Sequence, residues 1–594
     1  MKKNQELTPK KEDDKNNISG EAQTDGFTLQ EEMDEMSAIY NSFNPQQADG
    51  IPEQEFLTRL HKAGILENDK RMEPVLQLLR QIPLNANGRR YIPYNEFRRI
   101  VGSAIIVRQA MQGDLAIPEF DDFCKEITEL YAEVKNNRNG KVASYIPQLA
   151  EVDADLFAVS ICTTSGQRFS IGDFGMDFSL QSTSKPLTYC MVLEELGEQV
   201  VHQHVDKEPS GLAFNELKLK LRNNNGADAH GGGGSGSPVA VPHNPLINAG
   251  AIMCCSLVQR HKTMDKRLEF VIENWRALTH GIVKNQEDAT DVERDFGRKP
   301  RFNAEIFLGE RRTADRNNAL AYFMRENKAF MDNDTVDVQD VLELYFQCCS
   351  IEINAEQMAL AAATLSNAGV NPLTGKRIFE SRTVRNCLSV MYSCGMYDYS
   401  GEFAFQVGLP AKSGVSGALM VVVPNLMGIC IYAPRLDEYG NTCRGVEFCR
   451  KLVERFILHI YDGLVENSTK KDPRKRYKED MGINIKDPRK RRTQDLAASM
   501  MELIFAASYG DIDNIMKLHA RGIDLSIADY DNRTALHLAA AEGKLDVVRY
   551  LVDYYKKANI SISPLDRWGG TPLQDALRGG HQEIANFLQQ EGAV

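Results

Sequence analysis

The middle of the chain alternates short apolar blocks with polar turns, a pattern that predicts β-strands. From Asp155 to Asp173 apolar residues alternate around Ser165-Gly166, which predicts an antiparallel hairpin. The most apolar run, 418–433, is interrupted by Pro424-Asn425, so it predicts two short buried strands joined by a turn. A membrane-crossing helix needs a longer uninterrupted apolar run, so no membrane span is expected.

Two stretches carry helical spacing instead. The first begins near Pro186, which a helix tolerates in its first turn, and is expected to end at Gly197. The second begins at Val338 and is amphipathic. Its apolar positions include Leu342, Tyr345 and Phe346, and such aromatic side chains belong by default to a core.

The C-terminal part contains an internal repeat. Residues 534–539 and 571–576 both match the ankyrin pattern T-P-L-H-x-A, each with a substitution. The interval from Ala506-Ala507 to Ala539-Ala540 is 33 residues, which is the ankyrin period. We therefore expect all-α ankyrin repeats over 493–594, which present a face to a protein partner that the sequence does not identify.

The N-terminal part divides into two segments. Residues 1–30 have few large apolar side chains and are expected to be disordered. Residues 31–116 have helical spacing around turns at Gly50 and Gly88, which resembles a pair of EF-hands. The residues at the first and last ligand positions are not acids, so a helical module without calcium is expected; they are Pro45 and Phe56 in one loop, and Pro83 and Tyr94 in the other.

Three polar segments are expected to be insertions or linkers. The Gly/Ser-rich stretch within about 220–241 and the charged stretch within about 284–302 are predicted insertions in a larger domain. Residues 464–492 contain the pentapeptide DPRKR twice, at 472–476 and 487–491. A solvated basic linker is the favoured interpretation, over a nuclear signal or a site for an anionic partner.

Composition narrows the class of protein. The chain has 594 residues, enough for several domains, and its net charge of -12 argues against nucleic-acid binding. Its 12 cysteines include no C-x-x-C and no cluster at metal-ligand spacing, so free thiols in a reducing compartment and no metal site are expected. The first thirty residues contain no arginine and no apolar core typical of a signal, which leaves a cytoplasmic location open.

The main candidate for chemistry is Ser182-Thr183-Ser184-Lys185. A serine and a lysine three residues apart lie on one helix face, so the amine can reach the hydroxyl. A desolvated amine favours its neutral form and can act as the base that activates the serine. Taken alone, however, such a pair is more often a surface feature.

A second motif changes this weighting. Lys412-Ser413-Gly414 enters a predicted strand far downstream of the S-x-x-K helix, which is the pattern of serine β-lactamases and penicillin-binding proteins. In that fold the strand edge lies beside the helix, and backbone N–H groups form an oxyanion hole. The pattern predicts an α/β sandwich with a helical subdomain over about 117–463.

Several further stretches, taken in order along the chain, carry a resemblance to one family. They are 145–149, 181–186, 207–211, 243–251, 314–317, 393–398 and 408–414. On these stretches the chain resembles the animal phosphate-activated glutaminases, and the resemblance covers nearly everything except residues 1–30 and the two insertions.

The resemblance implies a reaction. The family hydrolyses L-glutamine to L-glutamate and ammonia through an acyl-enzyme, with Ser182 as nucleophile and Lys185 as its base. Tyr397 is implied to pass a proton to the leaving ammonia, and the backbone N–H groups of Ser182 and Val415 to form the oxyanion hole. The substrate-binding residues implied are Tyr145, Ser182, Asn248, Glu310, Asn317, Tyr345, Tyr397 and Val415.

The resemblance also implies properties beyond the active site. These are no cofactor, activation by inorganic phosphate, dimers that assemble into tetramers and filaments, and the mitochondrial matrix. Lys218 occupies a position where kidney-type relatives are expected to carry an aromatic residue, close to the Gly-rich insertion. Because of this difference, the expectations of a tetramer and of activation by phosphate are weaker for this chain than for kidney-type relatives.

Two alternative functions come from different classes. The same fold serves enzymes that acylate themselves with β-lactams or D-alanyl peptides, although the ankyrin repeats and the thiol-rich composition disfavour this. The other alternative is a scaffold that binds partners through its ankyrin repeats and carries a weak or inactive β-lactamase-like domain. The presence of Ser182, Lys185, Tyr397 and the K-S-G motif disfavours it.

Overall fold

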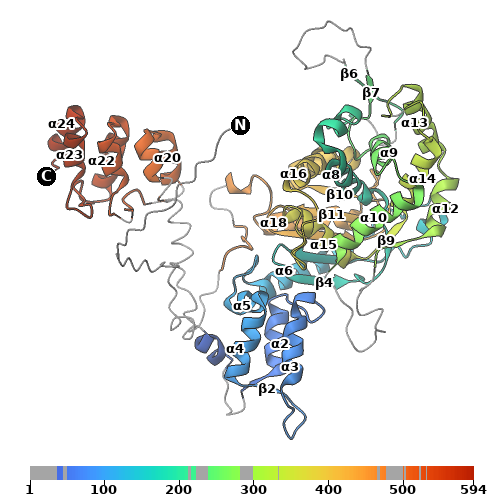
Figure 1. Cartoon of the computed structure of the whole chain (residues 1–594), viewed down its shortest axis with the longest axis horizontal. Coiled ribbons are helices and arrows are strands. Elements are labelled where there is room, and N and C mark those ends of the chain that lie inside the picture. Colours follow the sequence, from blue (N-terminus) through green and yellow to red (C-terminus); the bar gives the residue numbers. More distant parts are fainter. Residues whose placement is uncertain are drawn as a thin grey trace, which may run out of the picture. The chain divides into compact units, whose positions relative to one another are not determined.

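The structure, a computed structural model, divides into two units, Met1–Met481 and Gly482–Val594 (Figure 1). The segment predicted to be disordered, 1–30, and most of both predicted insertions lie outside the described residues. Within the described part, no helix is both long and apolar enough to cross a membrane. The described residues are 36–43, 50–211, 216–222, 239–280, 299–331, 333–464, 469–476, 500, 503–520, 524–529 and 531–593.

The N-terminal module contains two helix–loop–helix units whose loops pair. Ile51 lies opposite Ile92 in a two-stranded antiparallel ladder, and the buried rings of Phe56 and Phe97 meet edge to face with centroids 6.1 Å apart. This is the EF-hand layout predicted from the two turns. The elements are β1 (Ile51–Pro52), α2 (Glu53–Lys62), α3 (Glu73–Gln81), β2 (Tyr91–Ile92), α4 (Tyr94–Ser103) and α5 (Ile105–Gln112).

A five-stranded antiparallel sheet forms the centre of the larger unit. Both predicted hairpins are confirmed, since β3 pairs with β4 and β11 pairs with β12, and the strand order is β10-β11-β12-β3-β4. The strands are β3 (Ala158–Thr163), β4 (Arg168–Gly172), β10 (Ala411–Ser413), β11 (Ala418–Val423) and β12 (Met427–Tyr432).

Both faces of this sheet are covered, which explains why its strands read as continuous apolar runs. Along β11, Leu419 and Val421 join one hydrophobic core with helices α6 (Phe120–Lys135) and α18 (Cys443–Arg455). The alternate residues Met420 and Val422 join a second core on the opposite face.

Helix α15 (Ala355–Ser366) packs directly on the second face. A Cβ atom at Gly428 on β12 would lie 2.1 Å from the backbone nitrogen of Ala363, so only glycine permits this approach. The two cores therefore lie on either side of one sheet, as the predicted α/β sandwich requires.

The helical subdomain extends the second core. The helix that begins at Lys185 breaks at Gly197, as predicted, since the φ of 76° and ψ of 159° there are not helical. A second helical segment then continues α8 to His204. A small sheet, ordered β5-β9-β8, closes the subdomain beside the helices. The elements are β5 (Phe178–Ser179), α8 (Lys185–His204), α9 (Asn248–Leu257), α10 (Met264–Thr279), β8 (Arg301–Phe302), α12 (Ala304–Arg312), α13 (Asp315–Glu326), α14 (Val338–Cys349), β9 (Ile351–Ile353), α16 (Ser381–Cys394) and α17 (Ser400–Gln406).

The described ends of both predicted insertions form β-strands. The strands β6 (Lys220–Arg222) and β7 (Val239–Val241) pair antiparallel, so the first insertion emerges from a two-stranded ribbon. The second insertion was expected to reach residue 302, but Arg301–Phe302 forms β8. Arg301 lies opposite Glu352 of β9 and forms an ion pair with it at 3.0 Å, so a charged residue is accommodated in this strand.

The three basic residues of the first pentapeptide are exposed, and the segment also contacts the rest of its unit. Asp472 and Pro473 are buried, and Arg476 donates hydrogen bonds to the carbonyls of Gln112 and Gly113 at 2.6 and 2.8 Å. These carbonyls lie at the C-terminus of α5, where a helix favours cations. The second copy, 487–491, lies outside the described residues.

The smaller unit is built of stacked helices, as the ankyrin pattern predicted (Figure 1). Thr534 and Thr571 are the N-caps of the first helix in successive repeats, and each forms a capping box. The helices are α20 (Ile512–Ala520), α21 (Ala535–Ala541), α22 (Leu545–Lys557), α23 (Pro572–Arg578) and α24 (Gln582–Gln590).

Candidate active site

Ser182 lies in a tight turn between strand β5 and helix α8. The chain enters through Leu180, whose N–H donates to the carbonyl of Ile351 at 2.8 Å, and forms a 3₁₀ turn over Gln181–Ser184. Gln181 has a φ of 48°, in the left-handed region that side chains other than glycine adopt at a cost of about 1–3 kcal/mol. The serine therefore follows a strained residue and precedes the helix that carries Lys185.

Lys185 is the first residue of α8 and is 2% exposed. Its Nζ donates to Oδ1 of Asn248, the first residue of α9, at 2.7 Å. Burial lowers the pKa of Lys185 to about 8, from its usual 10.5. Near neutral pH a useful fraction of this amine is uncharged and able to accept the serine proton.

Tyr397 lies on the other side of Ser182. It follows the end of α16, has a φ of 53°, and its hydroxyl donates to the carbonyl of Ser413 at 3.1 Å. Burial raises the pKa of Tyr397, and a hydrogen bond from the Ser182 side chain opposes that shift. The phenol is therefore neutral, carries a proton and is in direct contact with the serine hydroxyl.

The end of strand β10 lies beside the Ser182 turn. A Cβ atom at Gly414 would lie 3.1 Å from the Leu180 carbonyl oxygen and 3.5 Å from the Thr183 nitrogen. Among the described residues, no backbone hydrogen bond outside the helices and strands involves the Val415 N–H. Two N–H groups in this neighbourhood match what an oxyanion hole requires.

A buried carboxylate lies beside the turn. Glu310 of α12 is 7% exposed, and its Oε1 accepts hydrogen bonds from the Tyr145 hydroxyl at 2.6 Å and from Gln181 Nε2 at 2.9 Å. Burial raises the pKa of Glu310, while these two hydrogen bonds oppose the shift. An ammonium group beside it would favour the ionised form of the carboxylate, so the site is suited to a cationic ligand group.

Amide groups continue the network behind Lys185. Asn248 Nδ2 donates to Asn317 Oδ1 of α13 at 2.9 Å. The ring of Tyr345, on α14, has its centroid 5.9 Å from Lys185 Nζ, and burial raises the pKa of this tyrosine. The helices α8, α9 and α14 lie side by side in Figure 1, so one layer of the subdomain supplies these groups.

Every site residue named from the sequence lies in this connected region. Val415 packs near Ile146 and Leu149, and a Cβ atom at Gly440 would touch both Val415 and Tyr397 at 3.9 and 3.6 Å.

Two residues in the region were given no role by the sequence. Gln181 bridges Glu310 and Tyr145, and its place just before the nucleophile was the available signal. Lys412, the first residue of the K-S-G motif, is fully buried beside Tyr397.

Metal-ligand clusters and disulfides are not features of the described residues. No group of three His, Cys, Asp or Glu side chains there could hold a metal ion. All 12 cysteines are described and free, and burial raises the pKa of Cys349, which lies near Lys185. The expectation of free thiols is confirmed.

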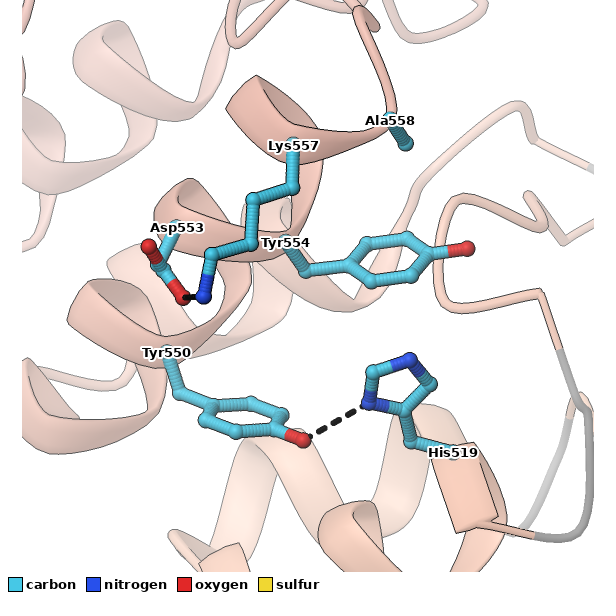
Figure 2. Close-up of a pocket in the computed structure, with 6 residues that line it drawn as sticks. All are labelled: His519, Tyr550, Asp553, Tyr554, Lys557 and Ala558. Carbon is cyan, nitrogen blue, oxygen red and sulfur yellow. Dashed lines mark hydrogen bonds and ion pairs between the residues drawn. The ribbon is translucent and has the colours of Figure 1, made fainter.

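The ankyrin unit has a separate hollow of about 350 Å³, between α20 and α22 (Figure 2). His519 hydrogen-bonds the Tyr550 hydroxyl at 2.8 Å, and Lys557 pairs with Asp553 at 2.7 Å. Its lining residues include no serine or cysteine, so this hollow does not support acyl transfer.

Family comparisons match the chain in three places. The profile described as Glutaminase matches residues 140–461, Ankyrin repeats (3 copies) matches 503–594, and EF-hand domain matches 36–118. The first match contains every candidate site residue. The match at 36–118 accompanies loops whose terminal ligand positions are not acids.

Individual relatives agree with these matches. The protein named Glutaminase liver isoform, mitochondrial, from Rattus norvegicus is 38% identical over 91% of this chain and 81% of its own length. The protein of the same name from Mus musculus is also 38% identical, with the same coverage. A protein named Glutaminase from Nostoc is 39% identical over 60% of this chain and 94% of its own length, so it corresponds to the catalytic part.

Proposed function

The chain belongs to the glutaminase family, and we propose that it hydrolyses L-glutamine through a covalent intermediate on Ser182. Its reaction converts the substrate side-chain amide into L-glutamate and ammonia. The observation that carries the mechanism is the buried amine of Lys185, one helical turn from Ser182, with its pKa lowered to about 8.

In the first step the Ser182 hydroxyl attacks the carboxamide carbon. Its proton passes to the uncharged Lys185 amine, and the N–H groups of Ser182 and Val415 stabilise the developing oxyanion. The C–N bond then breaks, and Tyr397 donates its proton to the leaving ammonia while taking one back from the lysine. The product is a glutamyl ester of Ser182.

In the second step a water molecule attacks the ester carbonyl. The same neutral amine accepts the water proton, the oxyanion occupies the same two N–H groups, and the Ser182 oxygen leaves as a hydroxyl. L-glutamate is released, and Ser182 and Lys185 return to their starting protonation states.

Substrate specificity follows from the two ends of glutamine. Glu310 pairs with the α-ammonium group, and the Tyr145 hydroxyl holds the carboxylate in place for that contact. The amide donors of Asn248 and Asn317, with the Tyr345 hydroxyl, suit the α-carboxylate. A β-lactam or D-alanyl peptide offers no free α-ammonium group for Glu310.

The test is ammonia release from L-glutamine by the wild-type protein and by a Ser182→Ala variant. Wild-type turnover is expected, with a loss of at least about 10⁴-fold in the variant. Turnover that survives in a folded Ser182→Ala variant would exclude the serine mechanism. The matched control is Ser184→Ala, since this neighbouring hydroxyl donates only to the Gln181 carbonyl, at 2.7 Å.

Three broader properties belong to the same proposal and rest on family membership. They are activation by inorganic phosphate, assembly into dimers and tetramers, and a mitochondrial location like that in the names of the rat and mouse relatives. Turnover measured over a phosphate series, with the mass in solution followed by light scattering, tests the first two. A rate and mass that stay constant across the series would contradict coupling between phosphate and assembly.

A further inference from the structure

Lys412 has a buried amine that the acyl chemistry does not use. It lies on β10, is 0% exposed, and its Nζ donates to two backbone carbonyls, those of Gly395 at 3.1 Å and Ser413 at 2.8 Å. Its amine also lies 4.4 Å from the centroid of the Tyr397 ring. Burying a lysine amine costs folding free energy even when its N–H groups have acceptors, so its position here indicates a role.

The two carbonyls belong to the two segments that complete the active site. Gly395 lies two residues before Tyr397, and Ser413 lies two residues before Val415. The Ser413 carbonyl accepts both the Lys412 amine and the Tyr397 hydroxyl, the latter at 3.1 Å. One side chain therefore bridges the backbone that carries the phenol and the backbone that carries an oxyanion donor.

The segment that contains Gly395 and strand β10 are in direct backbone contact. The Ser413 N–H donates to the Gly395 carbonyl at 3.1 Å. A Cβ atom at Gly395 would lie 1.8 Å from the carbonyl oxygen of Ala411, which explains the glycine. The Lys412 amine lies beside this backbone contact and against the face of the Tyr397 ring.

We infer that Lys412 is a positioning residue, which holds the Tyr397 hydroxyl and the Val415 N–H in the arrangement that proton transfer and oxyanion stabilisation require. This inference rests on the proposed serine mechanism. It assigns Lys412 an effect on the chemical steps and none on the ground-state binding of glutamine.

The protonation of Lys412 is consistent with this role. Burial, and then repulsion from Lys185, lowers the pKa of Lys412 well below its usual value. A neutral amine has two N–H groups, which match the two carbonyl acceptors. The same shift reduces the positive charge beside Lys185, which favours the uncharged form of that base.

The first experiment compares Lys412→Met with a control of matched burial. Arg444 is also buried and donates to the backbone carbonyls of Asn137 and Asp155, both at 2.8 Å. Its guanidinium lies over the ring of Phe157, which belongs to the core on the opposite face of the sheet. In Lys412→Met we expect kcat to fall about 100-fold with KM within about threefold, because the reacting groups are misplaced. Arg444→Met is expected to lower thermal stability and leave kcat unchanged.

A double-mutant cycle with Tyr397→Phe tests whether the two side chains act together. The loss in the double variant should be clearly smaller than the product of the two single losses, because both changes disturb the same Ser413 carbonyl. Independent, multiplicative losses would overturn the inference. So would a rise in KM with kcat unchanged, which would make Lys412 a substrate-binding group.

A second variant covers the case in which Lys412→Met does not fold. Lys412→Gln retains an N–H donor in the same direction, so its kcat is expected to lie between the wild-type and Lys412→Met values. An unchanged kcat, equal to that of Arg444→Met, would overturn the inference. The Ser182→Ala comparison keeps the two proposals separate. Absence of wild-type turnover would count against the proposed function, whereas a normal Lys412→Met enzyme would count only against the positioning role.

Discussion

The ankyrin unit and the active site both bury polar side chains within helices, but they satisfy them differently. In the ankyrin unit His537 is fully buried, accepts the Thr534 N–H at 3.1 Å and contacts the Gly570 carbonyl at 3.3 Å through its other nitrogen. In the active site, Lys185 is almost as deeply buried, and its amine has one acceptor within the described residues, Asn248. Both ring nitrogens of the histidine are engaged, whereas the Lys185 amine in its uncharged form has a free lone pair.

The backbone shows the same contrast. Among the described residues of the ankyrin unit, the left-handed positions that are not glycine are Asn532 and Asn559, and asparagine tolerates this conformation. In the active site the left-handed positions are Gln181 and Tyr397, which tolerate it less well. Strain therefore accompanies chemistry in one region, while the other adopts its shape at low cost.

This difference has a functional meaning. A fully satisfied buried group stabilises a fold and does not react, because changing its protonation would break hydrogen bonds. A buried group with unused capacity costs stability but can exchange a proton. At the end of β10, the hydroxyls of Ser413 and Ser416 are buried and have no hydrogen-bond partner among the described residues. This end of β10 therefore also contains buried polar groups with unused hydrogen-bonding capacity.

The largest effect should come from Lys185→Met. We expect kcat to fall by about 10³–10⁴-fold, since the general base is lost, with thermal stability unchanged or higher because a buried amine is removed. The matched control is Lys451→Met, which removes a surface lysine paired with Glu133 at 2.8 Å and should leave kcat unchanged. A kcat within tenfold of wild type would assign the base to another group.

Glu310→Gln should have the next largest effect, and it should act on binding. We expect kcat/KM to fall about 10–100-fold, mainly through KM, because the α-ammonium group loses its charged partner. Glu305→Gln on the same helix changes an exposed carboxylate and serves as the control. An unchanged KM in a folded Glu310→Gln variant would move ammonium recognition elsewhere.

The pH dependence of kcat/KM should show the titration of Lys185. The base acts when deprotonated, and its pKa is lowered to about 8, so activity is lost as the pH falls through that value. A rise of about fivefold is expected between pH 7 and pH 8. Steady-state rates at constant ionic strength provide the measurement, and a flat profile over this range would contradict a base titrating near 8.

The smallest effect on activity should come from the ankyrin unit. His537→Ala is expected to destabilise that unit by about 1–3 kcal/mol, because the Thr534 N–H loses its buried partner, and to leave kcat unchanged. Calorimetry of the full chain measures the shift of the ankyrin transition. His519→Ala, in the exposed hollow of Figure 2, should change stability by less than about 0.5 kcal/mol. Equal shifts for the two histidines would contradict the distinction drawn here.

Short-range patterns account for what could be predicted from the sequence. The two hairpins follow from alternation and turn residues, the ankyrin helices from a repeated N-cap threonine, and the Ser182–Lys185 pair from one helical turn. Each depends on residues that are close in the chain, and the physical rule that connects them is local.

The remaining features depend on contacts between distant segments. Asn248 meets Lys185 across 63 residues, and Arg476 reaches the end of α5 across 363 residues, so no spacing rule could have indicated either contact. The same applies to Lys412, whose two acceptors become neighbours only when β10 packs against the end of α16. Resemblance to a family named Asn248, but its contact with the lysine amine required the fold.

The central claim is that Ser182 carries the glutamyl group during turnover, and trapping that intermediate tests it most directly. The protein would be mixed with isotopically labelled L-glutamine, quenched in acid within milliseconds, digested and mapped by mass spectrometry. We expect the label on the peptide that contains Ser182, and its absence in Ser182→Ala. Label on another residue, or rapid turnover with no labelled peptide at any quench time, would contradict the acyl-enzyme mechanism.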